Sequence, residues 1–419
     1  MQTTLIQRYL GNKSLISEKI IDIVRQIASP GDLVFDAFSG SLAVSAALRS
    51  AGFEVASNDI NHFSWLFARA YFSASELPNP PGVTALNSGV SWAYWQEELA
   101  RLTDEDLSEI PYDQRRSDIF DHYCEEGANS AFVSKRGASG RRRFFSAENA
   151  RAIDRALNRI RYRYKEGQID EQGRCILTAA LINAVEKISN TQGTYHDFPR
   201  DFVDSRALRP ITLRMPDPEV FSGPPSRYIG KAEDSLEFAR RIPHHSVIYL
   251  DPPYNFRQYT SYYFMLNLLS SYAEIDDLDQ YFSDVEFVRG QNMKDDFKST
   301  FCNRRDFIPS LRTLIQRANA DHVILSYYDG PNHWGSFKSE DAETEGKKLL
   351  EEFFRSDLFV EDSYRFVPVE RRNYQSYGGY TAKPIQEFLF VARKSKPVEI
   401  ERDLGGTQWI GQGSVLGTA

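Results

Sequence analysis

Cysteine is scarce in this sequence, and long apolar runs are missing. Of the 419 residues three are cysteines, Cys124, Cys175 and Cys302, and they are scattered along the chain. An odd number of dispersed cysteines indicates neither a disulfide framework nor a metal site of the zinc type. No run reaches the roughly 18 apolar residues that a membrane span requires, and residues 1–13 lack the apolar region of a secretory signal. The sequence therefore predicts a cytoplasmic protein without a bound metal or a membrane partner.

Positive charge is also in short supply for the chain as a whole. The formal net charge is −8, which by itself argues against a polyanionic partner. Residues 130–170, however, contain eleven Lys or Arg and four acidic residues, a local charge of +7. Because the distribution of charge matters more than its sum, this segment is a candidate for contact with nucleic acid.

The apolar pattern predicts one interrupted α/β sheet. Helical spacing over residues 14–27 is followed by a strand at 33–35, a helix at 42–51 and a strand at 53–57, which is the order of a parallel βαβ unit. The pattern fades near residue 72 and resumes with strands near 228–229, 247–250, 322–327, 364–369 and 385–391. A chain of this length exceeds the roughly 250–300 residues at which one core stops growing. We therefore predict a Rossmann-like mixed sheet, mostly parallel with a closing antiparallel hairpin, formed by residues 1–72 and 227–394. A largely helical insertion at 73–226 and a tail at 395–419 complete the predicted organisation.

Acidic residues stand at the predicted ends of the first two strands. Asp36 ends the first strand, Gly40 follows in the turn, and Asp59 lies just after the second strand. Such a turn lets a nucleoside lie against the backbone, and the second acid can accept both ribose hydroxyls of an adenosine-bearing cofactor. The turn lacks the three glycines of a pyrophosphate site. The alternative interpretation is structural, with Gly40 in a tight turn and Asp59 capping a helix.

A second polar group follows the apolar strand at 247–250. Asp251, Pro252, Pro253 and Tyr254 come next, and the two prolines force the chain out of the sheet and hold this tip rigid. The Asp251 carboxylate and the Pro252 carbonyl offer two acceptors beside one aromatic face, which matches the two N–H donors of an exocyclic amine on a flat ring. The alternative is a Pro-Pro turn with a surface tyrosine.

Taken together, these motifs identify a family resemblance. The segments RYLGNKSLI (8–16), VFDAFSGS (34–41), SNDIN (57–61) and LDPPYN (250–255) occur in this order. They resemble the Dam-like DNA adenine-N6 methyltransferases, which use S-adenosylmethionine. The resemblance covers residues 5–72 and 189–391. The clearest departure is Leu42, where many members keep a glycine, and it leaves the path of that turn open.

The resemblance implies a role for each matching residue. Asp251, Pro252, Pro253 and Tyr254 would be catalytic, gripping an adenine that has been rotated out of the duplex. The residues expected to bind the cofactor are Tyr9, Gly11, Lys13, Asp36, Phe38, Gly40, Asp59, Ile60 and Asp234. Asp234 is preferred over Glu233 as the acid for the cofactor adenine.

Contacts to DNA are expected from two segments. We predict DNA binding by the basic loop of the insertion and by the segment after the strand tip, through Lys135, Arg136, Arg141, Arg142, Arg143, Arg257 and Gln258. Arg151, Arg155, Arg159 and Arg163 recur at every fourth residue of the helix that follows the loop. This helix is a further candidate for target recognition, and the alternative is an ordinary solvated face. The segment NTQGTY (190–195) either lines the base pocket or is a plain loop after a helix.

The sequence thus predicts a site-specific DNA adenine-N6 methyltransferase acting on double-stranded DNA. It would be the modification partner of a restriction endonuclease, or a solitary host or phage enzyme. The alternatives are a cytosine-N4 methyltransferase, an RNA adenine methyltransferase and a catalytically idle nucleic-acid-binding subunit.

Overall fold

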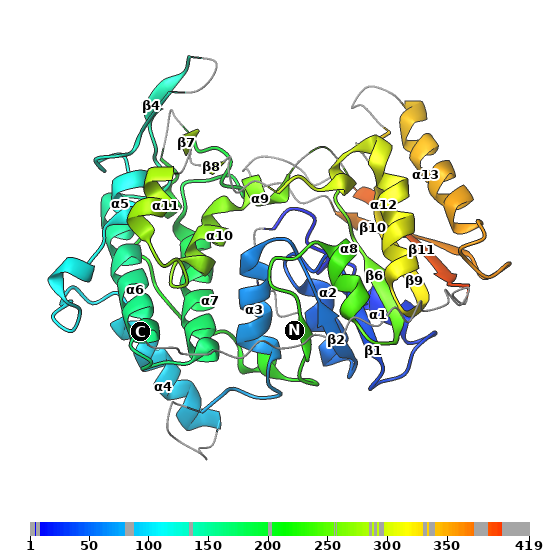
Figure 1. The fold of residues 1–419 in the computed structure, drawn as a ribbon, viewed down its shortest axis with the longest axis horizontal. Coiled ribbons are helices and arrows are strands. Elements are labelled where there is room, and N and C mark those ends of the chain that lie inside the picture. Colours follow the sequence, from blue (N-terminus) through cyan, green and yellow to red (C-terminus); the bar gives the residue numbers. More distant parts are fainter. Residues whose placement is uncertain are drawn as a thin grey trace, which may run out of the picture.

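A seven-stranded mixed sheet forms the centre of the protein, with the strand order β10-β11-β9-β6-β1-β2-β5 (Figure 1). The computed structural model describes residues 5, 9–79, 88–133, 137–199, 203–254, 256, 258–284, 287–288, 291–292, 297–329, 333–334, 340–372 and 384–395. β11 alone among these seven strands runs against the others, between β9 and β10. The predicted mixed sheet with its closing antiparallel hairpin is therefore confirmed. The strands are β1 (Leu33–Asp36), β2 (Glu54–Ser57), β5 (Tyr228–Ile229), β6 (His245–Leu250), β9 (Ala320–Asp329), β10 (Arg365–Arg372) and β11 (Pro384–Arg393).

Helices cover both faces of the sheet. Successive residues of a strand point to opposite faces, so Val34 packs against α1 (Ser17–Val24) and α2 (Ala43–Ser50) on one side. Phe35 packs with the opposite layer, which contains α8 (Ser235–Phe238), α12 (Arg304–Arg317) and α13 (Glu340–Phe354). Apolar residues on both faces explain why β1 and β6 appear in the sequence as continuous apolar runs.

A second, largely helical core lies beside the sheet (Figure 1). It contains α4 (Ser88–Arg101), α5 (Asp118–Tyr123), α6 (Ala147–Lys165) and α7 (Glu171–Ile188). Ile153, Leu157 and Ile160 of α6 are buried in this core, and Tyr164, one turn further on, is half-buried against it. α3 (His62–Phe72) and α10 (Phe264–Ser271) pack against α7 and belong to the same core. The domain boundaries proposed from the sequence remain predictions.

Short elements complete the described fold. β3 (Ala131–Val133) pairs with β4 (Ser139–Arg141), and β7 (Phe287–Val288) pairs with β8 (Gln291–Asn292), both antiparallel. The remaining helices are α9 (Tyr259–Tyr262), α11 (Leu278–Asp284) and the 3-10 turns η1 (Tyr112–Gln114), η2 (Ser205–Leu208), η3 (Pro218–Phe221), η4 (Ala239–Arg241) and η5 (Thr300–Cys302). Within the described ranges no helix has the length and apolar character needed to cross a bilayer.

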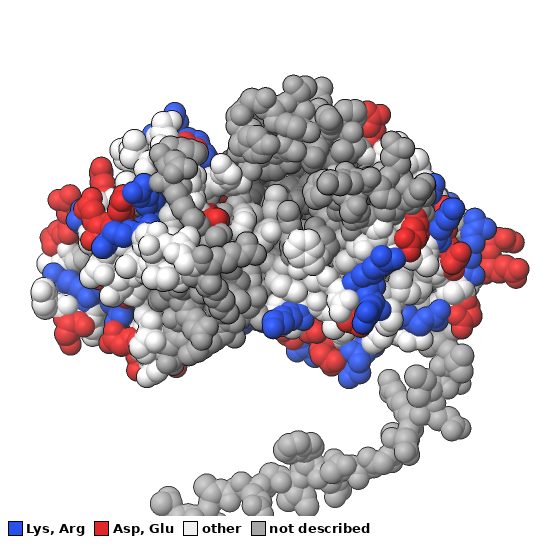
Figure 2. Space-filling view, turned by 90° about the horizontal axis from the view of Figure 1, so that it is seen from above, with Lys and Arg blue, Asp and Glu red and all other residues white. Residues whose placement is uncertain are grey.

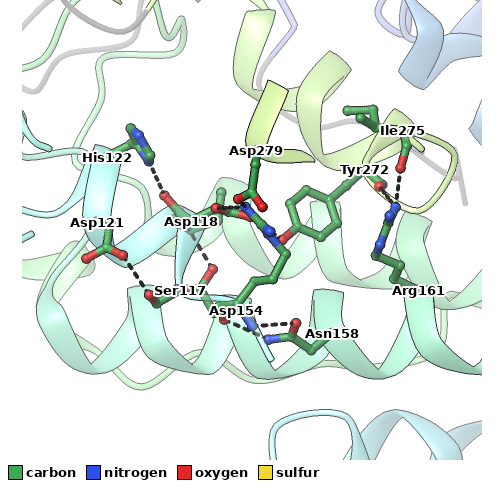
Figure 3. Close-up of polar contacts among 12 residues, drawn as sticks. Ser117, Asp118, Asp121, His122, Asp154, Asn158, Arg161, Tyr272, Ile275 and Asp279 are labelled. Carbon is green, nitrogen blue, oxygen red and sulfur yellow. Dashed lines mark hydrogen bonds and ion pairs between the residues drawn. The ribbon is translucent and has the colours of Figure 1, made fainter. Parts of the chain in front are cut away.

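A polar joint connects α5 and α6 to the segment between α10 and α11 (Figure 3). The Tyr272 hydroxyl donates to Asp118, whose carboxylate also pairs with Arg116 at 2.7 Å. Arg161 of α6 donates to the backbone carbonyls of Tyr272 and Ile275. These carbonyls lie just beyond the last turn of α10, where orphan acceptors need partners. The joint therefore fixes the far end of α10, whose near end adjoins the candidate site.

Candidate active site

The predicted site residues meet at one edge of the sheet, beyond the carboxyl ends of β1, β2 and β6. One pocket contains all four residues of the strand tip and seven of the predicted cofactor-binding residues, Tyr9, Gly11, Lys13, Phe38, Asp59, Ile60 and Asp234. The other two, Asp36 and Gly40, line a second, smaller pocket. The two pockets share residues, including Lys13 and Asp251. This is where parallel α/β sheets bind ligands, since β2 and β6 lie on opposite sides of β1.

The strand tip projects from β6 into the larger pocket. Asp251 follows the last residue of β6, and one of its carboxylate oxygens lies 2.9 Å from the Lys13 ammonium. The Tyr254 ring lies 5.2 Å from the ring of Tyr328 on β9, at an interplanar angle of 45°. Tyr254 is half-buried, so part of its ring remains accessible from the pocket.

Lys13 lies between two carboxylates. Its ammonium is 3.2 Å from Glu387 of β11 as well as 2.9 Å from Asp251. Glu387 is completely buried and also accepts a hydrogen bond of 2.8 Å from the Ser326 hydroxyl. The sequence analysis missed Glu387. The available signal was a lone acid in the apolar run IQEFLFVA (385–392).

Tyr9 forms one wall where the two pockets meet. Its ring stacks on Tyr263 of the α9–α10 segment, with 4.8 Å between ring centroids. Gly40 lies directly beneath it, because a Cβ on Gly40 would approach the Tyr9 ring to 2.8 Å. Gly40 also has a φ of +45°, which disfavours other residues. Leu42, two residues after Gly40, adopts a φ of 61° and is buried, so the turn enters α2 through a leucine in the left-handed conformation.

Asp36 presents an unused carboxylate oxygen in the smaller pocket. Its Oδ2 accepts a 2.7 Å hydrogen bond from the Ser45 hydroxyl, whereas Oδ1 is buried and has no hydrogen-bond partner among the described residues. Burial raises the pKa of Asp36 to about 7, and the negative charges of Asp251 and Asp59 add to the increase. A buried carboxylate of this kind is suited to a cationic ligand group, which would supply both a donor and a compensating charge.

Asp59 fastens the first turn to the end of β2. Its Oδ2 accepts from the Gly40 amide at 2.9 Å, and its Oδ1 accepts from the Asn61 amide and side chain at 2.9 and 2.8 Å. The N-cap of α3 is Asn61, so the alternative that Asp59 only caps the helix does not describe this arrangement. Burial raises the pKa of Asp59. Oδ2 retains a lone pair for a further donor.

Asn58 and Ser235 hold the segment that carries Asp234 against the sheet, and the sequence analysis named neither. The Asn58 side chain donates to the Glu233 carbonyl at 3.0 Å and to the Ser235 hydroxyl at 3.1 Å. Ser235 in turn donates to the Ala37 carbonyl at 2.6 Å. Asp234 caps α8 through the Leu236 amide, and both Asp234 and Glu233 line the larger pocket. The choice of Asp234 remains a prediction.

The predicted DNA-binding residues are dispersed. Lys135, Arg136 and Arg257 lie outside the described residues. Gln258 lines the larger pocket, where its side-chain oxygen accepts from the Ser299 amide at 3.0 Å. Arg141 binds the backbone carbonyls of Glu125 and Gly127, and Arg143 pairs with the Glu125 carboxylate while remaining partly exposed.

Arg142 requires a correction. Its side chain is in the interior, with the residue 1% exposed, and it donates to the carbonyls of Asn129 and Ala131 at 3.0 and 3.2 Å. Burial lowers the pKa of Arg142 to about 10. A guanidinium enclosed in this way supports the β3–β4 hairpin and is not placed to contact a phosphate.

The arginines of α6 also differ from both interpretations offered by the sequence. Arg159 is buried and donates to the carbonyls of Leu102 and Asp104 at 2.9 and 2.8 Å. The other three contact the same neighbouring segments, Arg155 through the Thr103 carbonyl, Arg163 through Glu98, and Arg151 through Glu126 and the Phe120 ring. These side chains attach α6 to residues 98–126 and form neither a free DNA-reading face nor a simply solvated one.

The segment 190–195 packs behind the site. The Tyr195 amide donates to the Tyr262 carbonyl at 2.7 Å, and its buried hydroxyl donates to Glu186 at 2.7 Å. The segment does not contribute to the lining of the larger pocket. It supports α9, which forms part of the pocket wall through Tyr259 and Thr260.

Comparison with known proteins agrees with this geometry. The chain is 26% identical over 394 residues to the type II methyltransferase M.NlaIII of Neisseria lactamica, covering 92% of this chain and 99% of that protein. It is 27% identical over 398 residues to the type II methyltransferase M.FokI of Planomicrobium okeanokoites, covering 92% of this chain and 52% of that protein. It is 25% identical over 402 residues to the modification methylase StsI of Streptococcus sanguinis, covering 95% of this chain and 53% of that protein. The chain thus spans about half the length of M.FokI and StsI. Residues 9–301 match the family described as D12 class N6 adenine-specific DNA methyltransferase, and the chain belongs to this family.

Proposed function

We propose that this protein transfers a methyl group from S-adenosylmethionine to N6 of an adenine in double-stranded DNA, as the modification enzyme of a restriction system. The observation that carries the proposal is the pair of adjoining pockets, which bring the strand tip Asp251–Tyr254 together with the turns that follow β1 and β2. Family membership and the names of the similar proteins, type II methyltransferases and a modification methylase, support it. A cognate restriction endonuclease as partner and a cytoplasmic location belong to the same proposal.

The residues of the two adjoining pockets fit S-adenosylmethionine, the cofactor that the family implies. The unpaired oxygen of Asp36 would bind the amino group of its methionine end, and the close contact of Gly40 with Tyr9 shapes the space beside it. Asp59 would hold the ribose, and Phe38, Ile60 and Asp234 would border the adenine. When bound, the cofactor supplies an electrophilic methyl group on a sulfonium.

The strand tip would hold the base. An adenine stacked inside a duplex is out of reach, so the nucleotide must be rotated out of the helix. Tyr254 would stack on the extruded ring, while the Asp251 carboxylate and the Pro252 carbonyl accept the two amino protons. Fixing both donors orients the N6 lone pair, so catalysis would rest on positioning and electrostatics.

Double-stranded DNA is the proposed partner, and its contact surface follows from this placement. Figure 2 shows Lys and Arg interspersed with Asp and Glu at both sides of the molecule. Because opposite charges alternate, the described surface in that view does not form one broad basic face. Of the predicted basic contacts with described side chains, Arg141 is exposed and Arg143 is partly exposed, and both remain proposed phosphate contacts.

The test is methyl transfer from tritiated S-adenosylmethionine to duplex DNA, single strands and structured RNA, followed by identification of the methylated nucleoside. We expect N6-methyladenine in duplex DNA, and we expect Asp251→Ala to lower the rate by more than about a hundredfold, because it removes a preorganised acceptor. Asp113→Ala, the same change at an exposed position, is the control.

Each competing function has its own result in this assay. Detection of N4-methylcytosine would show that cytosine is the methylated base, and methylation of RNA in place of duplex DNA would show that RNA is the substrate. An Asp251→Ala variant that methylates as well as the parent would leave the strand tip without a catalytic role. A chain that binds DNA and never methylates it would be the idle subunit.

A further inference from the structure

Glu387 is the buried third member of a charge cluster that the strand tip shares with Lys13. The Lys13 ammonium lies 2.9 Å from Asp251 and 3.2 Å from Glu387, and the three side chains are 4%, 18% and 0% exposed, respectively. Glu387 belongs to β11, far from both partners in the sequence. No part of the predicted catalytic or cofactor motif includes it.

The cluster carries more negative than positive charge. Two carboxylates share one ammonium, so its formal charge is −1 when all three groups are ionised. Burying an additional carboxylate is costly unless it is paired and hydrogen-bonded. Lys13 and the Ser326 hydroxyl supply that pairing for Glu387. Without Glu387, Lys13 would pair with Asp251 alone. Its positive charge would then neutralise the Asp251 carboxylate more fully and weaken the hydrogen bond that this carboxylate accepts from the adenine amino group.

β11 also supports the aromatic part of the tip. Glu387 is the register partner of Tyr328 on β9, and the Tyr328 ring packs on Tyr254 at 5.2 Å. The β9–β11 pair therefore supports both functional groups of the tip. Glu387 contacts Lys13, which also pairs with Asp251, whereas Tyr328 contacts the tip through the Tyr254 ring.

We propose that Glu387 is a positioning residue that divides the charge of Lys13, so that Asp251 stays oriented and its negative charge toward the adenine amino group is not fully neutralised by Lys13. This inference rests on the proposed function. Methyl transfer forms an N6–carbon bond as the carbon–sulfur bond of the donor breaks, and the sulfonium charge passes to N6 until one amino proton is released to solvent. A cluster with a charge of −1 beside N6 stabilises that transient positive charge, whereas a neutral cluster does not.

Glu387→Gln is the sharpest probe, because glutamine keeps the size of the side chain and an acceptor for Lys13 while removing the charge. In single-turnover methylation with saturating cofactor and DNA, we expect the rate to fall roughly ten- to hundredfold, the size of effect that one neighbouring charge exerts. The dissociation constants for S-adenosylmethionine and for duplex DNA should stay within twofold. The control is Glu370→Gln, the same change at an exposed position of the adjacent strand β10.

A double-mutant cycle with Asp251→Asn shows whether Glu387 acts through Asp251. If it does, Glu387→Gln has no further effect in the Asp251→Asn protein. An equal slowing in both backgrounds, or a Glu387→Gln rate within twofold of the unmodified protein, would overturn the inference. The methylation assay is first run on the unmodified protein. If that protein does not methylate DNA, the result counts against the proposed function and not against the role of Glu387.

Discussion

At the scale of single residues, the buried carboxyl group of Asp36 lowers the stability of the ligand-free protein when it is ionised. Burial raises the pKa of its carboxyl group from 3.8 to about 7, so the folded protein holds this proton to a higher pH than the unfolded chain does. The stabilising contribution of the protonated form is therefore fully present below pH 3.8 and is lost as the pH rises through about 7. Above that pH the folded protein carries a buried negative charge on Asp36, which a cationic ligand group would offset.

Replacing Asp36 by Asn should separate stability from binding. At pH 8 and without cofactor we expect Asp36→Asn to be more stable than the parent by up to roughly 4 kcal/mol, at about 1.4 kcal/mol per unit of pKa, with the gain shrinking toward pH 4. Thermal unfolding at several pH values measures this. S-adenosylmethionine should bind the variant at least tenfold more weakly, and the parent's affinity should fall below pH 7 while the variant's does not.

The corresponding control is Asp113→Asn at an exposed position. It should change neither the unfolding curve nor the affinity measured by calorimetry. A variant at Asp36 that binds the cofactor as tightly as the parent would remove the amino-group role from this residue.

Several of these residues could be predicted from the sequence because they follow strand ends. Asp36 and Asp251 both come directly after apolar runs, and the carboxyl ends of parallel strands meet at one edge. Glu387 does not follow a strand end, and Asn58 does follow β2, but its position alone does not identify its partner. The role of Glu387 depends on the antiparallel register between β9 and β11, and that of Asn58 on a segment 175 positions away in the chain.

At the scale of elements, continuous apolar runs predicted the sheet well, whereas charged helices were harder to interpret. α12 was not predicted, because Pro309 interrupts its segment and arginines surround it. Its apolar residues Phe307, Leu311 and Leu314 are nevertheless buried against the sheet. Packing of that face outweighs the backbone hydrogen bond that proline removes.

α6 illustrates the limit of charge patterns. Arginine at every fourth residue places the side chains on one face, but the pattern does not say what that face meets. Here Arg155 and Arg159 donate to the carbonyl groups of residues 102–104, and Arg151 and Arg163 pair with acidic side chains. Backbone carbonyls and DNA phosphates both attract guanidinium groups, so only the tertiary structure distinguishes the two uses.

Arg159→Ala tests this structural role. The buried Arg159 guanidinium donates hydrogen bonds to the Glu109 carboxylate and to the Leu102 and Asp104 carbonyls. Because its removal leaves these acceptors without this donor, the free energy of unfolding should fall by roughly 2–4 kcal/mol. The dependence of log K for DNA on log salt should keep its slope, since no phosphate contact is lost. A slope reduced by about one, with unchanged stability, would instead make Arg159 a phosphate contact.

At the scale of the whole molecule, the sequence predicted one sheet with a long insertion, but not how the two are joined. α3 and α10 both lie outside the predicted insertion at 73–226, yet they share its hydrophobic core. Amphipathic periodicity identifies an apolar face without identifying its partner. The polar joint of Figure 3 adds a second attachment, through Arg161 and Asp118, between the insertion and the end of α10.

Arg49 of α2 links the two ends of the insertion to the catalytic sheet. Its buried guanidinium donates to Tyr71 and Ala74 where the chain leaves, and to Val220, Phe221, Gly223 and Pro224 where it returns. Gly223 makes this approach possible, because a Cβ there would lie 2.7 Å from the Arg49 carbonyl oxygen and its φ is +112°. Burial lowers the pKa of Arg49 to about 10, so the group remains charged at neutral pH.

Arg49→Met should loosen both ends of the insertion at once. Methionine keeps the apolar stem but leaves several buried carbonyl groups without donors, each costing roughly 1–3 kcal/mol where water cannot replace the lost bond. We expect the thermal midpoint to fall by about 5–10 °C, for a net loss of roughly 3–5 kcal/mol, and limited proteolysis to cut first near residues 74 and 220. Arg25→Met, the same change at an exposed position of the neighbouring helix end, should leave both measurements unchanged. Equal midpoints for the two variants would show that the hydrophobic core around α3 and α7, rather than Arg49, holds the insertion to the sheet.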